Sequence, residues 1–167
     1  MKEIGGHFIF ERFSYNQYHE TNLLLSSGRN CLRYIIKERN IRTIYLPYFL
    51  CETLLDVCLK EDIEVKFYHV DEKLHPIINA NELSENEFVY IVNYYGLFST
   101  ETLEQIKKKY KNIIIDNTHD FFDKNNIGVD TIYNYRKNFG VPEGACITGD
   151  LQLSDKLAKR NSFFYII

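Results

Sequence analysis

The stretch that most constrains this 167-residue chain runs from Asn112 to Ala145. Three consecutive isoleucines, Ile113 to Ile115, form an apolar run typical of a buried strand, and Asp116 follows them directly. Further along, Lys137 precedes a turn rich in glycine and proline, after which another short strand is predicted. In an open α/β sheet, ligands bind in a crevice at the carboxyl ends of the strands. We therefore expect the acid and the lysine to face each other in such a crevice.

A carboxylate and a lysine that face each other have a specific chemical use. Pyridoxal 5'-phosphate (PLP) needs a lysine amine for its Schiff base, and a carboxylate keeps its pyridine nitrogen protonated so that the ring can accept electrons. The commoner explanation of this spacing is structural: Asp116 begins a turn after a strand, and Lys137 is a solvated surface lysine. Spacing alone does not decide between the two.

The hydrophobic pattern along the chain alternates between strand and helix. Strands are predicted at 43–46, 64–70, 88–92, 113–116, 130–135 and 145–148, and helices at 27–38, 53–59 and 100–110. This order predicts an α/β fold, with a mainly parallel (mixed) sheet flanked by helices in one domain over 1–167. We expect residues 1–25 to be irregular, 71–86 to form a polar connection and 154–160 to be helical, before an apolar terminus at 163–167.

Composition excludes several classes of function. The net charge of −3 gives no general attraction to nucleic acid or to an anionic membrane. We find neither an apolar run long enough to span a bilayer nor a signal peptide. His7 and His19 are expected to be surface or capping residues rather than metal ligands. The cysteines form no CxxC pair, so we expect core thiols in a reducing cytoplasm; they are Cys31, Cys51, Cys58 and Cys146.

Two further spots are candidates for ligand binding. Ser27 is a suitable N-cap for the helix that begins near Gly28, and the free N–H groups and dipole of a helix start can bind phosphate. An ordinary capped helix explains the same pattern. Tyr48 and Phe49 follow Pro47 at the end of a predicted strand, where they could stack on a planar ligand or pack on the next helix.

Taken together, five segments in this order resemble the N-terminal half of the DegT/DnrJ/EryC1/StrS sugar aminotransferases. They are Ser27–Asn30, Leu46–Tyr48, Asn93–Gly96, Ile115–His119 and Arg136–Ala145, within a resemblance that runs from Gly5 to Asp150. Members of this family are PLP enzymes of the aspartate-aminotransferase fold (fold type I). The resemblance implies that this chain is a partial large domain of that fold, without the small C-terminal domain.

The resemblance also implies a role for each matching residue around the cofactor ring. Lys137 matches the Schiff-base lysine, and Asp116 matches the carboxylate that faces the pyridine nitrogen. His119 matches the position near the ring hydroxyl. Cys51 stands where most members have an aromatic residue that stacks on the ring, so Phe49 or Tyr48 would have to take that place.

The cofactor phosphate has matching positions too. Gly28, Arg29 and Asn30 match the helix start whose backbone amides hold the phosphate in the family. Asn134 stands where many members have a phosphate-binding serine.

The implied activity is amino transfer from an amino-acid donor, glutamate, to a keto group of a nucleotide-linked sugar, in surface-polysaccharide or secondary-metabolite biosynthesis. Family members are longer than this chain and are homodimers in which the partner completes each cofactor site. An incomplete sheet would leave an unpaired edge and exposed apolar surface. Two alternatives stay open: a non-catalytic family member that folds or dimerises without turnover, and an unrelated nucleotide-binding module, for which the sequence has neither GxGxxG nor GxxxxGK[ST].

Overall fold

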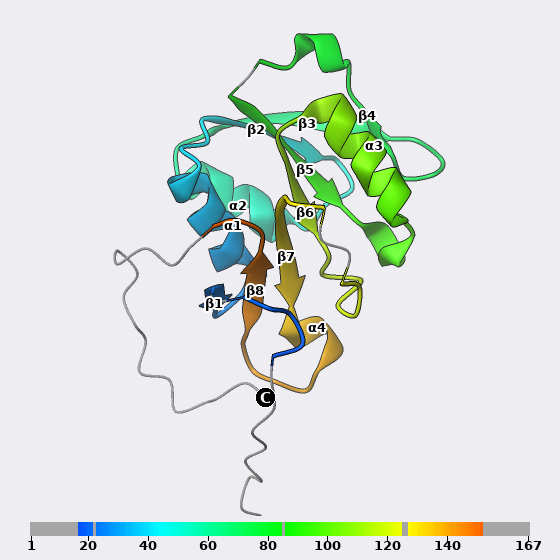
Figure 1. Ribbon diagram of the computed structural model, residues 1–167. Helices are drawn as coiled ribbons and strands as arrows, with labels where there is room; N and C mark the ends of the chain where they lie inside the picture. Colours follow the sequence, from blue (N-terminus) through cyan, green and yellow to red (C-terminus); the bar gives the residue numbers. More distant parts are fainter. Residues whose placement is uncertain (1–16, 22, 85, 125–126, 152–167) are drawn as a thin grey trace, which may run out of the picture.

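An eight-stranded sheet forms the centre of the computed structural model, which describes residues 17–21, 23–84, 86–124 and 127–151 (Figure 1). The strands are β1 (Leu23–Leu25), β2 (Thr43–Pro47), β3 (Glu64–Val70), β4 (Pro76–Ile77), β5 (Glu87–Val92), β6 (Ile113–Asp116), β7 (Asp130–Asn134) and β8 (Ala145–Thr148). The helices are α1 (Gly28–Glu38), α2 (Glu52–Lys60), α3 (Thr100–Tyr110) and α4 (Tyr135–Asn138), with 3-10 turns η1 (Ala80–Glu82) and η2 (Tyr94–Gly96).

The sheet is mixed but mostly parallel, which confirms the predicted fold class. Its strand order is β1-β8-β7-β6-β5-β2-β3-β4. The inner strands β3, β2, β5, β6 and β7 pair in parallel, whereas β8 is antiparallel to both β7 and β1, and β4 is antiparallel to β3. Both edge strands are short, three residues in β1 and two in β4, and short edges offer little backbone for pairing with another chain.

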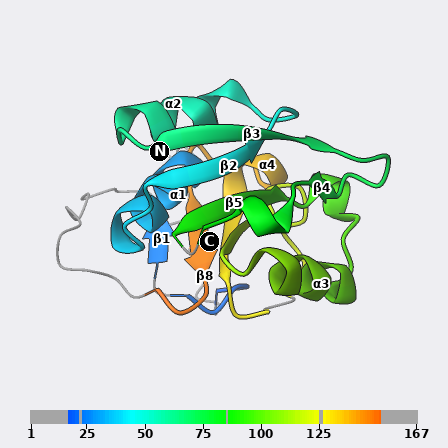
Figure 2. The same cartoon turned by 90° about the horizontal axis from the view of Figure 1, so that it is seen from above.

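Helices cover the two faces of the sheet, and alternate strand residues point to each face. Leu32 of α1 and Leu54 of α2 pack in one core cluster with Tyr90 and Ile114. The opposite cluster contains Leu103 and Ile106 of α3 together with strand residues such as Val89 and Ile115. Figure 2 shows α2 and α3 on opposite sides of the strands.

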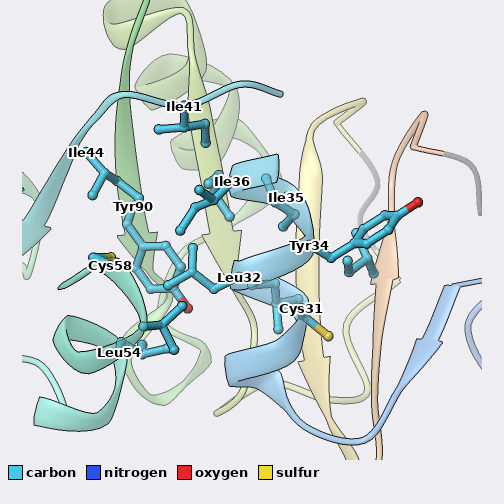
Figure 3. Close-up of a cluster of buried hydrophobic side chains, with 14 of the residues drawn as sticks. Cys31, Leu32, Tyr34, Ile35, Ile36, Ile41, Ile44, Leu54, Cys58 and Tyr90 are labelled. Atoms are coloured by element: carbon cyan, nitrogen blue, oxygen red, sulfur yellow. The ribbon is translucent and has the colours of Figure 1, made fainter. Parts of the chain in front are cut away.

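This alternation decides which strand-end side chains can meet. Tyr90 faces α1 and α2, and Figure 3 shows its ring among Leu32, Leu54 and Cys58. Asp116 follows Ile114 by two residues, so it points to the same face at the end of β6. Asn134 follows Ile132 in the same way at the end of β7. The side chains of these strand ends therefore converge on the face that carries α1.

Several local predictions differ from the structure. The strand predicted at 130–135 ends at Asn134, because the Asn134 side chain accepts a hydrogen bond from Arg136 N and begins α4. Residues 1–25 were expected to be irregular, but 23–25 form β1, and the polar connection at 71–86 contains β4 and η1. The predictions for His7, the helix at 154–160 and the apolar terminus at 163–167 lie outside the described residues.

Two side chains are placed opposite to expectation. His19 is buried rather than at the surface: its ring stacks on Tyr133 at 3.7 Å, and its Nε2 lies 2.7 Å from the carbonyl oxygen of Phe121. Cys51 was expected to be a core thiol but is exposed, whereas the other three cysteines are buried. His19 is buried by residues more than a hundred positions further along the chain, which local pattern does not reveal, whereas Cys51 lies in the loop between β2 and α2.

Candidate active site

A cavity of about 670 Å³ opens at the carboxyl ends of the parallel strands. Its wall contains Val92 of β5, Asp116 of β6 and Asn134 of β7, together with the loop that follows β2. The N-terminus of α1 and the short helix α4 complete the wall. This is the crevice in which open α/β sheets bind their ligands, and we call it the first cavity.

Asp116 is the acid of this cavity, and both of its oxygens have hydrogen-bond donors. Its Oδ1 accepts from Thr118 N at 2.9 Å, and its Oδ2 accepts from the hydroxyl of Tyr90 at 2.8 Å. The side chain is buried, at 7% exposure. Burial raises the pKa of Tyr90 well above its usual value, and the negative charge of Asp116 raises it further. Tyr90 therefore stays protonated as a donor to the carboxylate.

Lys137 lies on α4, the single turn of helix that follows β7. Asn134 caps this turn, and its carbonyl accepts a second hydrogen bond from Asn138 Nδ2 at 3.3 Å. Tyr135 anchors the turn, since it is buried and its ring lies 5.0 Å from that of Phe121. Lys137 itself is exposed, and its amine has no hydrogen bond or ion pair within the described ranges. The amine is therefore available to a ligand.

The start of α1 forms the wall beside β7. Ser27 caps this helix as predicted, because its hydroxyl accepts a hydrogen bond from Asn30 N at 3.4 Å. A Cβ atom on Gly28 would lie 3.5 Å from Asn134 Nδ2, so the helix start and the end of β7 lie close together. The first turn of α1 carries no acidic residue, which leaves the positive end of its dipole uncompensated there. Gly28 and Arg29 line the first cavity, whereas Asn30 does not.

The loop after β2 supplies the aromatic wall. Phe49 lines the first cavity, is 56% exposed, and stacks on Tyr94 with ring centroids 5.1 Å apart. Tyr48 is not among the lining residues; its ring stacks on Phe67 instead, at 5.0 Å. Of Tyr48 and Phe49, the two predicted replacements for the ring-stacking residue, only Phe49 therefore lies in the wall of the first cavity.

Cys51 and His119 also line the first cavity. The Cys51 sulfur lies 3.3 Å from Thr53 Oγ1, and this contact is the main cause of a lowered pKa for the thiol. The positive charges of Lys137 and Arg29 lower that pKa further. His119 Nδ1 accepts a hydrogen bond from Tyr95 N at 3.4 Å, and the two rings stack at 5.6 Å. The rim of the cavity is thus electropositive and partly aromatic.

The first cavity brings together the site residues predicted from the sequence except Tyr48, which stacks on Phe67, and Asn30, which lines a neighbouring cavity. Sequence reasoning assigned no role to Tyr90, Tyr94 or Thr118, although Tyr94 and Thr118 lie in segments that carry the resemblance. Tyr90 stood within an apolar run and was read only as part of a central strand. A buried tyrosine hydroxyl needs a partner, and that requirement was the available signal.

The arrangement suits a flat ligand that has a positively charged group at one end and a negatively charged group at the other. A buried carboxylate lies at the base of the cavity, and cationic side chains, among them Arg29, Arg136 and Lys137, lie around it. Among the described residues, no group of His, Cys, Asp and Glu side chains is arranged to hold a metal ion. No helix in the same part of the chain is both long and apolar enough to cross a membrane.

Comparison with known proteins supports the fold. No protein-family model and no curated protein matches the sequence. Among solved structures, NtdA from Bacillus subtilis with bound cofactor PMP aligns with a TM-score of 0.60 and 17% identity, over 78% of this chain and 33% of NtdA. A DegT DnrJ EryC1 StrS aminotransferase from Brucella abortus aligns with a TM-score of 0.59 and 15% identity, over 76% of this chain and 41% of that protein.

A third solved structure gives the same result. The sugar aminotransferase CalS13 from Micromonospora echinospora aligns with a TM-score of 0.59 and 10% identity, over 76% of this chain and 41% of CalS13. The chain therefore has the fold found in sugar aminotransferases, as its sequence resemblance predicted. It spans less than half the length of each of these three proteins.

Proposed function

We propose that this chain is the cofactor-binding part of a PLP-dependent aminotransferase that acts on a nucleotide-linked keto-sugar. One observation carries the proposal: the buried carboxylate of Asp116 and the unpaired amine of Lys137 line one cavity at the strand ends. The fold adds support, because NtdA was solved with bound PMP and CalS13 is a sugar aminotransferase.

The residues of the first cavity fit PLP at each of its polar groups. Asp116 offers a buried anion for the protonated pyridine nitrogen, and Lys137 offers an amine for the aldehyde. The start of α1, with Gly28, Arg29 and the nearby Asn134 amide, offers donors and positive charge for the phosphate. Phe49 offers a ring face, and Cys51 occupies the position of the missing aromatic residue.

The proposed chemistry assigns one task to each side chain. Bound PLP would supply an aldehyde for the donor amine and a ring that accepts the electron pair left when a proton is removed. Lys137, once free, would take that proton from the α-carbon of glutamate and deliver it to C4′, the carbon of the cofactor that receives the amino group. Asp116 would hold the proton on the pyridine nitrogen, with Tyr90 and Thr118 fixing the carboxylate. Arg29 would neutralise the phosphate, and His119 would orient the ring hydroxyl.

The test is direct binding of PLP to the purified chain. We expect an absorbance band of a protonated Schiff base, and borohydride reduction should fix the cofactor on the peptide that contains Lys137. Lys137→Ala should abolish both signals, whereas the control Lys108→Ala, an exposed lysine of α3 outside the first cavity, should keep them. Absence of the band from the unmodified chain would refute the proposal.

A second experiment separates turnover from binding alone. Glutamate added to the PLP-bound chain should convert the bound cofactor to its amine form, seen as loss of the Schiff-base band. Retention of the band would favour the alternative of a family member that binds the cofactor without turnover.

We also propose a single α/β domain over 1–167 that acts as a cytoplasmic homodimer. Exposed aromatic side chains such as Phe49 and Tyr95 beside the site support an interface there.

A further inference from the structure

A second cavity of about 350 Å³ adjoins the first. The two share Ser27, Arg29, Thr53 and Arg136 in their walls, so they form one continuous depression around the start of α1. Its volume falls within the range of small-molecule sites. We propose that this second cavity binds a phosphate or diphosphate group of the substrate.

Positive charge dominates the wall of the second cavity. Four cationic side chains line it against two carboxylates: Arg29, Arg33, Lys60 and Arg136 against Asp56 and Glu143. This excess is local, because the whole chain carries a net charge of −3. A positive cavity in a negative protein attracts anions specifically to that place.

Two of these cations, Lys60 and Arg136, are neither paired with a carboxylate in the part of the chain described nor assigned above to the cofactor phosphate. Arg33 is held by Glu61, with Nε and Oε1 2.6 Å apart. Arg29, Lys60 and Arg136 form no ion pair with any carboxylate within the described ranges. Unpaired arginines are also the side chains best suited to phosphate, since their planar group donates two parallel hydrogen bonds.

Neutral donors complete the wall. Asn30 donates its backbone N–H to the hydroxyl of Ser27 at 3.4 Å and its side-chain amide to the hydroxyl of Ser26 at 2.7 Å. Each serine hydroxyl thus acts as an acceptor toward Asn30 and keeps its own proton to donate. Asn30 therefore orients two donors of the second cavity.

The position of the second cavity indicates which anion it takes. Gly28 and Lys137 line only the first cavity, which we assign to the cofactor, whereas Arg33 and Lys60 line only the second. A substrate that reaches Lys137 with its keto group and carries a diphosphate further along would place that diphosphate in the second cavity. This identification as substrate rests on the proposed function; the anion site itself does not.

Calorimetric titration of the full chain with inorganic pyrophosphate at low ionic strength tests the site. Lys60→Gln should weaken binding about fivefold, as expected for loss of one exposed charge contact. Asp56→Asn should strengthen binding, because it removes a negative charge from the same wall. The matched control is Lys108→Gln, which also removes a lysine from the last turn of a helix and should change nothing. Equal affinities for the unmodified chain, Lys60→Gln and Asp56→Asn would overturn the proposal.

Repeating the titration with PLP-saturated protein separates this proposal from the first. Pyrophosphate should still bind, with the same dependence on Lys60, if the second cavity takes a second anion. Complete loss of pyrophosphate binding in the presence of PLP would overturn it, because the cavity would then belong to the cofactor phosphate. A chain that binds pyrophosphate through Lys60 but never binds PLP would refute the proposed function and leave the anion site standing.

Discussion

The hydrogen bond between Tyr90 and Asp116 gives the sharpest quantitative prediction. The Tyr90 hydroxyl donates to Asp116 Oδ2 at 2.8 Å, and both side chains are buried. Tyr90→Phe removes only the hydroxyl and leaves one oxygen of a buried carboxylate without its donor. A hydrogen bond to a charged group contributes about 1.5–3 kcal/mol. We therefore expect a loss of about 2 kcal/mol in the free energy of unfolding.

Tyr110→Phe is the matched control. Tyr110 is also a buried tyrosine, but its hydroxyl donates to a neutral acceptor, the carbonyl oxygen of Pro76, at 2.9 Å. Loss of a neutral hydrogen bond costs about 1 kcal/mol. With a slope of about 2 kcal/mol per M in urea, the midpoint should fall by about 1 M for Tyr90→Phe and about 0.5 M for Tyr110→Phe.

Urea unfolding at pH 7, followed by circular dichroism, measures both midpoints. Equal shifts for the two variants would refute the reasoning, because Tyr90 would then be bonded to a group that carries no charge. That result would also remove the support for Asp116 as the anionic partner of a pyridine nitrogen. A larger shift for Tyr90→Phe, together with an altered spectrum of bound PLP, is the outcome we expect.

Three further predictions concern stability. Gly96→Ala should lower the free energy of unfolding by at least about 1–2 kcal/mol, since the φ angle of Gly96 is +68° and an added Cβ would lie 2.8 Å from Asp120 Oδ2. Gly140→Ala, with open space around the added Cβ, should leave that free energy unchanged in the same urea assay. Arg39→Gln should lower the free energy of unfolding, measured by thermal unfolding, by about 3 kcal/mol, because the buried Asp130 carboxylate loses its hydrogen bonds of 2.8 and 2.9 Å from the Arg39 guanidinium. Asp150→Asn changes an exposed partner of Arg39 and should lower that free energy far less. Burial lowers the pKa of His19 below 6.5, so on acidification the histidine of the unfolded chain takes up a proton before that of the folded chain. The free energy of unfolding should therefore fall as the pH drops below about 6.5. His19→Phe should remove this part of the pH dependence.

The sequence was sufficient to predict where strand ends would meet. Apolar runs that end on a polar residue identified β5 and β6, and parallel pairing brings such ends to one edge. The position of Asp116 in the first cavity follows from that rule alone. The N-cap of α1 was predictable for the same kind of reason, since Ser27 acts on its own helix.

Features that depend on pairing register or on distant segments were not predictable. Tyr90 and Asp116 meet because β5 pairs with β6 so that Val92 lies opposite Asp116 and the tyrosine ring reaches along the shared face. No local pattern specifies that register. His19 is buried because it packs against Phe121 and Tyr133, more than a hundred residues further along the chain.

Asn134 stands where the sequence resemblance implies a phosphate-binding serine, and it can perform much of the same chemistry. Asparagine and serine are equally good N-caps, and Asn134 Oδ1 begins α4 by accepting a hydrogen bond from Arg136 N. The same side chain keeps its Nδ2 group as a donor, and that nitrogen lies beside Gly28 at the start of α1. A serine hydroxyl at this position would divide its roles in the same way, accepting from the helix and donating to a phosphate. Cys51 allows no such equivalence, because a thiol has no ring face, so any stacking on a planar ligand falls to Phe49 and its partner Tyr94.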